Sequence, residues 1–256
     1  MRALGFKKWL FGVGAILFWI GLWWLLALQF GKPLLLPTPA AVFKTLLQLM
    51  TTAGFWQMVF TSLSRILVGI LLALVSGTML ALLTVKSAFF YHLFSPLLTL
   101  FKATPVASVI FLMLLWIGRE RVPLVIALMM ALPIFWSNLQ EGLLQTDRKL
   151  IEMAKAFRLS LKAKLLHVHL PSILPYFLSA CRSAISLAWK AGVAAEVLCV
   201  PERSLGRAIY EGKLYLLTDE LFAYTLTVIL LSVAIEAGAL ALLDVVKKGE
   251  KHAKAA

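Results

Sequence analysis

Long and almost uncharged apolar stretches constrain the fold of this chain more than any other feature. A helix needs about 20 apolar residues to cross roughly 30 Å of hydrocarbon, and its backbone must satisfy its own hydrogen bonds there. Six stretches reach or approach that length, namely residues 9–30, 56–85, 105–118, 122–139, 172–200 and 221–246. The sequence therefore predicts an all-α, polytopic membrane protein with about six transmembrane helices, formed by a single domain over residues 1–256.

Two of these stretches depart from a simple span. Residues 105–118 are too short to cross the membrane unless the apolar residues 93–101 before them contribute. Residues 9–30 follow three basic residues as in a signal peptide, but the apolar core of a signal peptide is only about 7–15 residues long. No pair of small residues in the spacing of a cleavage site follows, so we expect this stretch to be retained as the first helix.

The distribution of basic residues predicts the orientation of the helices. The net charge of +13 is not gathered into one patch with interleaved aromatic residues, so nothing indicates nucleic-acid binding. Six alternating helices would instead bring most basic residues to one side: Arg2, Lys7, Lys8, Lys86, Arg148, Lys149, Lys155, Arg158, Lys162, Lys164, Lys247, Lys248, Lys251 and Lys254. The positive-inside rule makes that side the cytoplasm, and both termini are then cytoplasmic.

Residues suited to catalysis or metal binding are absent or badly spaced. Cys181 and Cys199 lie about 27 Å apart along one helix, too far for a disulfide within that helix. His167 and His169 point to different faces of a helix, which is unsuited to a shared metal ion. The chain has no P-loop and no Gly-x-Ser-x-Gly or His-Glu-x-x-His motif. We therefore expect no enzyme, no cofactor and no metal site, and ATP hydrolysis would belong to a separate subunit.

The polar segment after residue 147 is expected to form a helical hairpin. Its apolar residues recur at helical spacing and predict a single stripe: Leu150, Ala154, Phe157, Leu161, Leu165 and Val168. Ser160 is suited to cap a second helix after a break near Leu159, and Pro171 to open the fifth span. Periodicity alone also allows an interfacial helix whose lysines meet anionic lipid.

The motifs in this segment resemble the EAA loop of permeases in ABC-type importers. The matching residues are Glu152-Met-Ala-Lys-Ala-Phe-Arg158 and Val168-His-Leu-Pro171. The resemblance implies that residues 147–171 are a cytoplasmic loop that couples the permease to ABC ATPase subunits. The residues expected to carry this coupling are Glu152, Ala154, Phe157, Arg158, Val168, Leu170 and Pro171.

Arg158 stands where this family has a glycine. A left-handed residue at this turn would cost a side chain about 1–2 kcal/mol relative to glycine. We therefore expect either that the turn uses ordinary backbone angles or that it has shifted toward Ser160. Met153 and Val168 replace an alanine and an isoleucine of the pattern, which changes only side-chain volume.

Shorter fragments resemble the permeases of the nitrate, sulfonate and taurine type. They are Leu36-Pro-Thr-Pro39, Thr61-Ser-Leu-Ser-Arg-Ile-Leu-Val-Gly69, Ser95-Pro96, Lys102-Ala-Thr-Pro105 and Leu205-Gly206. This resemblance implies a type I importer fold in a bacterial inner membrane, with a second permease copy, an extracytoplasmic solute-binding protein and a small, anionic solute. Small residues at positions 191, 192, 194 and 195 would let another helix approach, either from a second copy or from the same chain.

Ionisable residues inside the spans indicate a candidate substrate pathway. Charged groups within a membrane are costly and by default line a pathway or form a pair. Arg65, Lys190 and Glu196 are the candidates, and the two cations would suit a small anion. In the alternative, Lys190 pairs with Glu196 or Glu236 and serves packing alone. A rival function is an ATP-independent secondary transporter or channel, which would require relay residues or an inverted repeat that the sequence does not present in strong form.

Overall fold

The computed structural model describes residues 2–253, and the side chains of residues 11–160, 162–239 and 241. Within this range the regular structure is entirely helical. The elements are α1 (Arg2–Phe30), α2 (Pro39–Met50), α3 (Ala53–Lys86), α4 (Ala88–Ala103), α5 (Val106–Ile117), α6 (Val122–Leu144), α7 (Arg148–Ala156), α8 (Leu161–Lys164), the π-helix η1 (Leu165–His169), α9 (Leu170–Cys199), α10 (Leu205–Leu214) and α11 (Thr218–Ala253). The expected all-α architecture is confirmed.

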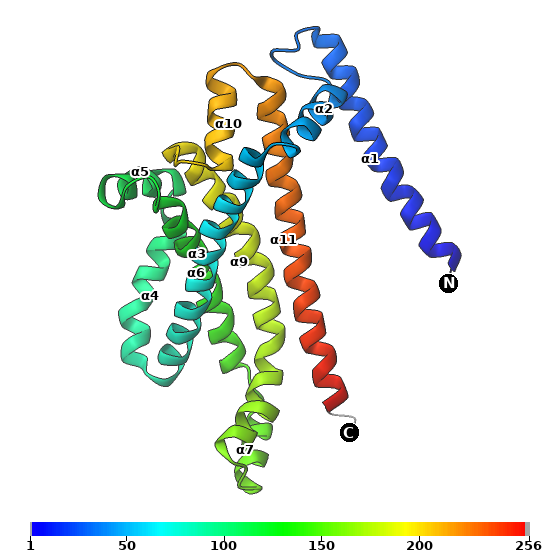
Figure 1. The fold of residues 1–256 in the computed structure, drawn as a ribbon. Coiled ribbons are helices and arrows are strands. Elements are labelled where there is room, and N and C mark those ends of the chain that lie inside the picture. Colours follow the sequence, from blue (N-terminus) through cyan, green and yellow to red (C-terminus); the bar gives the residue numbers. More distant parts are fainter. Residues whose placement is uncertain (1, 254–256) are drawn as a thin grey trace.

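Three helices, α3, α6 and α9, form the centre of the bundle. Helix α6 packs against both α3 and α9, and α11 lies on the other side of α9 (Figure 1). Glycines allow the close approach of α3 to α6. A Cβ atom on Gly69 would lie 2.4 Å from the carbonyl oxygen of Leu124, and one on Gly77 would lie 2.8 Å from the Cβ of Phe135. The core therefore depends on helix surfaces without side chains at these two positions.

The small residues of α9 serve the same kind of packing. A Cβ atom on Gly192 would lie 2.8 Å from Cγ1 of Ile66 in α3, and Ala191 and Ala195 are buried. Of the two explanations that the sequence left open, packing within the same chain accounts for these three residues. Ala194, in contrast, is exposed.

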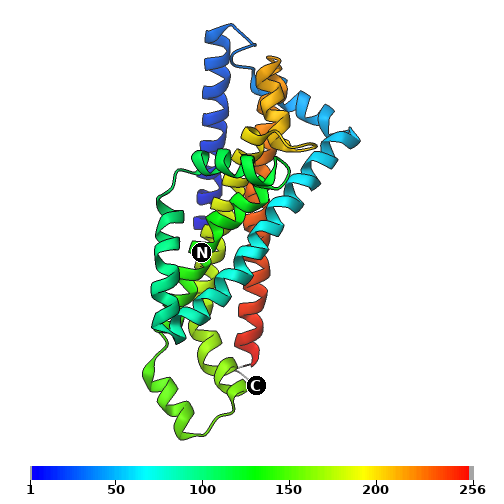
Figure 2. The same cartoon turned by 90° about the vertical axis from the view of Figure 1, so that its left-hand side faces the viewer.

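Residues 105–118 correspond to α5, and they reach the length of a span only together with the preceding helix α4, as the sequence analysis noted. Helix α4 runs along the bundle, and α5 turns across its end at an angle of 109° (Figure 2). The break occurs at Thr104 and Pro105, because a proline disfavours the helical region for the residue before it. Thr104 accordingly has extended angles, with φ −78° and ψ 130°.

Among the described residues, four helices are long and apolar enough to cross a membrane: residues 11–30, α3, α6 and residues 218–239. The bent pair α4–α5 raises this number to five, one fewer than the six stretches expected from the sequence. Helix α9 has 30 residues and is about 45 Å long, but Arg182, Lys190 and Glu196 make it more polar than these helices.

Helix α1 diverges from the bundle and meets it at its C-terminal end (Figure 1). There Trp23 donates a hydrogen bond of 3.1 Å from Nε1 to the carbonyl of Pro37, and its ring stacks on Phe222. Helix α2, which the sequence analysis did not predict, begins at the N-cap Thr38 with Pro39 in its first turn. Most of α1 leaves apolar side chains exposed.

The two ends of the bundle carry different elements. The end with α7 also holds the α3–α4 connection, and α11 ends toward it (Figure 1). The opposite end holds α10, α5 and the α1–α2 loop (Figure 1). We call these the α7 end and the α10 end.

Replacing Gly69 by Ala is expected to destabilise the bundle, because the new Cβ atom would overlap the backbone of α6. Overpacking of this kind costs about 1–3 kcal/mol and lowers the melting temperature in detergent. Gly21→Ala is the matched control, since no atom lies within 4 Å of a Cβ at that position. Equal melting temperatures for the two variants would contradict the close packing of α3 and α6.

Candidate functional site

Two hydrogen-bonded caps define the helical hairpin at the α7 end. The side chain of Asp147 accepts a hydrogen bond of 2.8 Å from the backbone N–H of Lys149, which starts α7. Ser160 Oγ accepts one of 3.2 Å from the N–H of Ala163, which starts α8. The predicted cap at Ser160 and the break near Leu159 are therefore confirmed.

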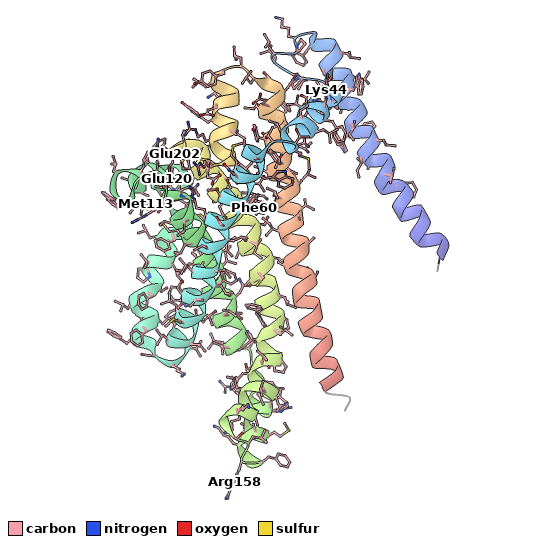
Figure 3. All side chains as sticks on the ribbon, viewed as in Figure 1. Lys44, Phe60, Met113, Glu120, Arg158 and Glu202 are labelled. Carbon is pink, nitrogen blue, oxygen red and sulfur yellow. The ribbon has the colours of Figure 1, made fainter. Side chains whose placement is uncertain are left out.

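The turn between the two caps places Arg158 in the left-handed region, with φ 48°. The N–H of Leu159 bonds to the carbonyl of Ala154, and the N–H of Arg158 bonds to that of Lys155. This pair of bonds is the Schellman motif, whose left-handed residue is usually glycine. Both expectations for this turn were wrong. The turn does not use ordinary backbone angles, and it has not shifted to Ser160; Arg158 itself adopts the left-handed conformation. Its side chain points away from the bundle at the tip (Figure 3).

One face of the hairpin is closed by small and branched side chains. Ala154 in α7 and Val168 in η1 are both buried. Because α7 packs against η1, a larger residue at position 154 would separate the two helices. Ala154 and Val168 therefore help to hold the two helices of the hairpin together.

The opposite face of the hairpin is apolar and exposed. Phe157 at the turn is 75% exposed, and Glu152 beside it in α7 is also exposed. Other large apolar side chains share this exposure: Leu150, Met153, Leu165, Leu166 and Leu170. The prediction that the apolar residues of the hairpin lie on a single face was wrong. Ala154 and Val168 are buried, whereas Leu150, Phe157 and Leu165 are exposed, because the turn at Arg158 separates the two helices of the hairpin. We call Leu150, Met153, Phe157, Leu165, Leu166 and Leu170 the tip surface.

The second helix of the hairpin continues into α9. Residues 161–199 are helical throughout, and only the π-helix η1 interrupts the α-helical pattern. The N–H of Leu170 bonds to the carbonyl of Leu165, five residues earlier. A π-turn before Pro171 relieves the clash between a proline ring and the carbonyl four residues before it. Pro171 thus lies in the first turn of α9, as expected, without separating α9 from the hairpin.

A buried carboxylate lies near the α10 end of α9. Glu196 is 0% exposed and accepts hydrogen bonds from Ser62 Oγ at 2.7 Å and from the N–H of Gly206 at 3.2 Å. Arg65 Nη1 lies 3.1 Å from Glu196 Oε1, and Arg65 Nη2 lies 2.8 Å from Glu120 Oε2. The structure therefore brings two predicted pathway residues together as a pair. The sequence analysis missed Ser62 and Glu120, which are distant in sequence from Glu196.

Lys190 lies apart from this pair. Its side chain is exposed on the bundle, and none of the ion pairs among the described side chains includes it. The pairing of Lys190 with Glu196 or Glu236 is therefore not observed. Lys190 shares its exposed face of α9 with residues 183, 187 and 194, which lie at helical spacing.

Within the described part of the chain, no group of three metal-ligating side chains is close enough to hold an ion. Cys181 and Cys199 are buried and unpaired.

Comparison with known proteins identifies the family. Residues 65–251 match the family described as the binding-protein-dependent transport system inner membrane component. The chain belongs to this family. It is thus a permease subunit of an ABC importer and a multi-pass inner membrane protein, as the EAA-like motif indicated.

Relatives of this permease are named for three solutes. It is 27% identical to the taurine transport system permease protein TauC of Escherichia coli (strain K12), over 90% of this chain and 86% of TauC. It is 28% identical to the putative aliphatic sulfonates transport permease protein SsuC of Bacillus subtilis (strain 168), over 73% of this chain and 68% of SsuC. The nitrate import permease protein NrtB of Synechococcus elongatus is 29% identical, over 58% of this chain and 53% of NrtB.

Replacing Arg158 by Gly is expected to stabilise the hairpin by about 1 kcal/mol, because glycine adopts the left-handed conformation without a Cβ penalty. Amides of α7 that exchange by local opening of the hairpin should then exchange about fivefold more slowly. Hydrogen exchange measured by mass spectrometry on the purified permease tests this. Arg158→Lys, which keeps both the charge and the Cβ atom, should exchange like the original chain. An equal rate in the two variants would contradict strain at this turn.

Proposed function

We propose that this permease imports a small anionic solute, powered by cytoplasmic ABC ATPase subunits that bind the tip surface. The exposed Phe157 at the end of the hairpin is the single observation that carries this proposal. Several large apolar side chains exposed at one end of a protein are characteristic of a protein interaction site. Since α7 extends beyond the bundle (Figure 1), a partner can enclose this surface from several sides.

The tip surface is also suited to transmit movement. Leu165, Leu166 and Leu170 belong to the same continuous helix that carries Lys190 and Glu196 at its far end. A displacement of the hairpin by the ATPase would therefore shift α9 against α3 and α6 without an intervening loop. Glu152 lies on the exposed side of α7 and adds a polar contact at the rim.

The basic residues support an orientation with the α7 end in the cytoplasm. Lys86 lies at the α3–α4 connection, and Arg148 to Lys164 lie in the hairpin, both at the α7 end. By the positive-inside rule this end, and with it both termini, is cytoplasmic. The α10 end then faces an extracytoplasmic solute-binding protein that delivers the solute.

We place the solute pathway along the exposed face of α9. A lysine facing lipid at the middle of a span costs about 2.5–3.5 kcal/mol on insertion scales, so an exposed and unpaired Lys190 favours a water-lined surface. A second copy of the permease facing this surface would enclose the route, which supports a homodimer. Lys190 is the cation that attracts the solute, whereas Arg65 is already compensated by Glu196 and Glu120 and borders the route at its outer end.

The names of the relatives support an anionic solute. TauC, SsuC and NrtB are named for taurine, aliphatic sulfonates and nitrate. A sulfonate group and a nitrate ion each carry one negative charge, which is shared among three oxygen atoms. The uncompensated charge of Lys190 is of the sign that such a group requires.

Replacing Phe157 by Ala is expected to weaken binding of the ATPase partner. Truncation of a buried interface anchor costs about 2 kcal/mol or more, which corresponds to a roughly thirtyfold lower affinity. Purification from native membranes in mild detergent, with the co-purifying ATPase quantified, measures the effect. Phe60→Ala is the control, since Phe60 is exposed on the side of the bundle. ATP-independent uptake in vesicles, with no ATPase partner at all, would instead support a secondary transporter.

Replacing Lys190 by Gln is expected to raise the KM for an anionic solute about tenfold, equivalent to about 1.4 kcal/mol of lost attraction. Lys190→Arg should restore most of the affinity because it keeps the charge. Uptake into vesicles that contain the complete importer, measured over a range of solute concentrations, gives the values. Arg182→Gln removes a charge from another exposed position of α9 and should leave KM unchanged. An equal effect of the two Gln variants would count against a pathway at Lys190.

A further inference from the structure

One carboxylate connects three separate elements at the α10 end. Glu120 lies in the turn between α5 and α6. Its Oε2 pairs with Arg65 in α3 at 2.8 Å, and its Oε1 accepts a hydrogen bond of 2.9 Å from the backbone N–H of Glu202. Figure 3 shows Glu120 and Glu202 side by side next to α5. The side chain of Glu120 therefore fastens the α5–α6 turn to both α3 and the α9–α10 turn.

The two bonds of the Arg65 guanidinium differ in their surroundings. Glu196 is fully buried, whereas the Glu120 side chain is 47% exposed. Removing one partner of a buried pair leaves an uncompensated charge, but an exposed carboxylate regains water when it separates. The bond to Glu120 is thus the one that can open and close, and the bond to Glu196 is the fixed one.

The α9–α10 turn is strained and tightly held. Val200 and Arg203 both have left-handed angles, with φ 51° and 50°, and a β-branched residue such as Val200 is rarely found there. Gly206 packs so closely that a Cβ atom would lie 2.3 Å from the Cβ of Glu196, and the N–H of Leu205 bonds to Ser62 Oγ at 3.0 Å. Backbone strain of this kind persists only where the surrounding contacts enforce it, and it is typical of switch regions.

Helix α5 is positioned to move when the exposed bond opens. It is separated from α4 by the bend at Pro105 and from α6 by Gly118, whose φ is 72°. Val109 and Ile110 face the bundle, while Leu115 and Trp116 on its far part are exposed. Met113, Leu114 and Ile117 also pack against the bundle. The polar contacts that fasten the turn after α5 are the bonds of Glu120 and the exposed Arg119–Glu202 ion pair.

We propose that the ion pair between Glu120 and Arg65 is a latch. Glu120 can separate from Arg65, whereas Arg65 stays paired with the buried Glu196. The latch holds α5 and its turn across the α10 end, and it opens when solute enters there. This proposal rests on the proposed function for the direction of transport. Glu120 and Arg65 are positioning residues in it and need no contact with the solute.

The latch itself is tested on the purified permease alone. Glu120→Ala should speed hydrogen exchange roughly three- to tenfold at the amides of residues 118–122, 200 and 202–204, because it removes the carboxylate bonds to Arg65 and to the N–H of Glu202. The amide of Glu202 is the most direct reporter, since it donates to Glu120. Glu211→Gln is the matched control: it also removes one negative charge at this end, but its carboxylate pairs with Arg207 of the same helix, α10. Equal exchange in the two variants overturns the latch.

The role in transport is tested in vesicles with the ATPase subunits and the binding protein. Without the latch the α10 end opens without solute, so Glu120→Ala should raise ATP hydrolysis in the absence of solute about threefold, whereas Glu211→Gln should not. Faster exchange with unchanged hydrolysis overturns the role of the latch in transport. Absence of ATP-driven uptake by the original chain would refute the proposed function instead, and the exchange result would still decide whether Glu120 fastens α5.

Discussion

The close packing of α9 against α3 and α6 is the constraint on which the rest of the structure depends. Gly69, Gly77 and Gly192 remove the side chains that would keep these helices apart. In a membrane, lipid is as apolar as leucine, so helices associate through packing and polar bonds rather than through the hydrophobic effect. Tight packing at three points makes the centre rigid, and a rigid centre allows a force applied at one end to be felt at the other.

Helix α9 links the two functional ends through this core. At the α7 end it is continuous with η1 and α8, and at the α10 end it carries Glu196 and leads into the strained turn at Val200. The π-turn before Pro171 lets this helix continue past the proline ring without a clash with the preceding turn. The hairpin and the latch are therefore attached to one continuous element, although they lie at opposite ends of the bundle.

Local signals in the sequence predicted most of the fold and part of the site. Apolar length predicted the spans, and the side-chain chemistry of Ser160 predicted the hairpin break. The error in the hairpin arose where two signals competed. The Schellman bonds of the turn place Arg158 in a conformation that favours glycine. The pairing of Arg65 with Glu196, 131 residues away, was not predictable because no local pattern encodes which distant helices meet.

The charged residues within the bundle separate by their partners into two kinds. Arg65 and Glu196 neutralise each other in a buried setting and, with the N–H of Gly206, join α3, α9 and α10, so removing either would leave an uncompensated charge. Lys190 has no such partner among the described side chains and yet lies on a helix that spans the bundle. The bundle pairs the cation of Arg65 with carboxylates but, within its described residues, does not pair that of Lys190. In the proposed pathway, solute or water supplies this missing partner of Lys190.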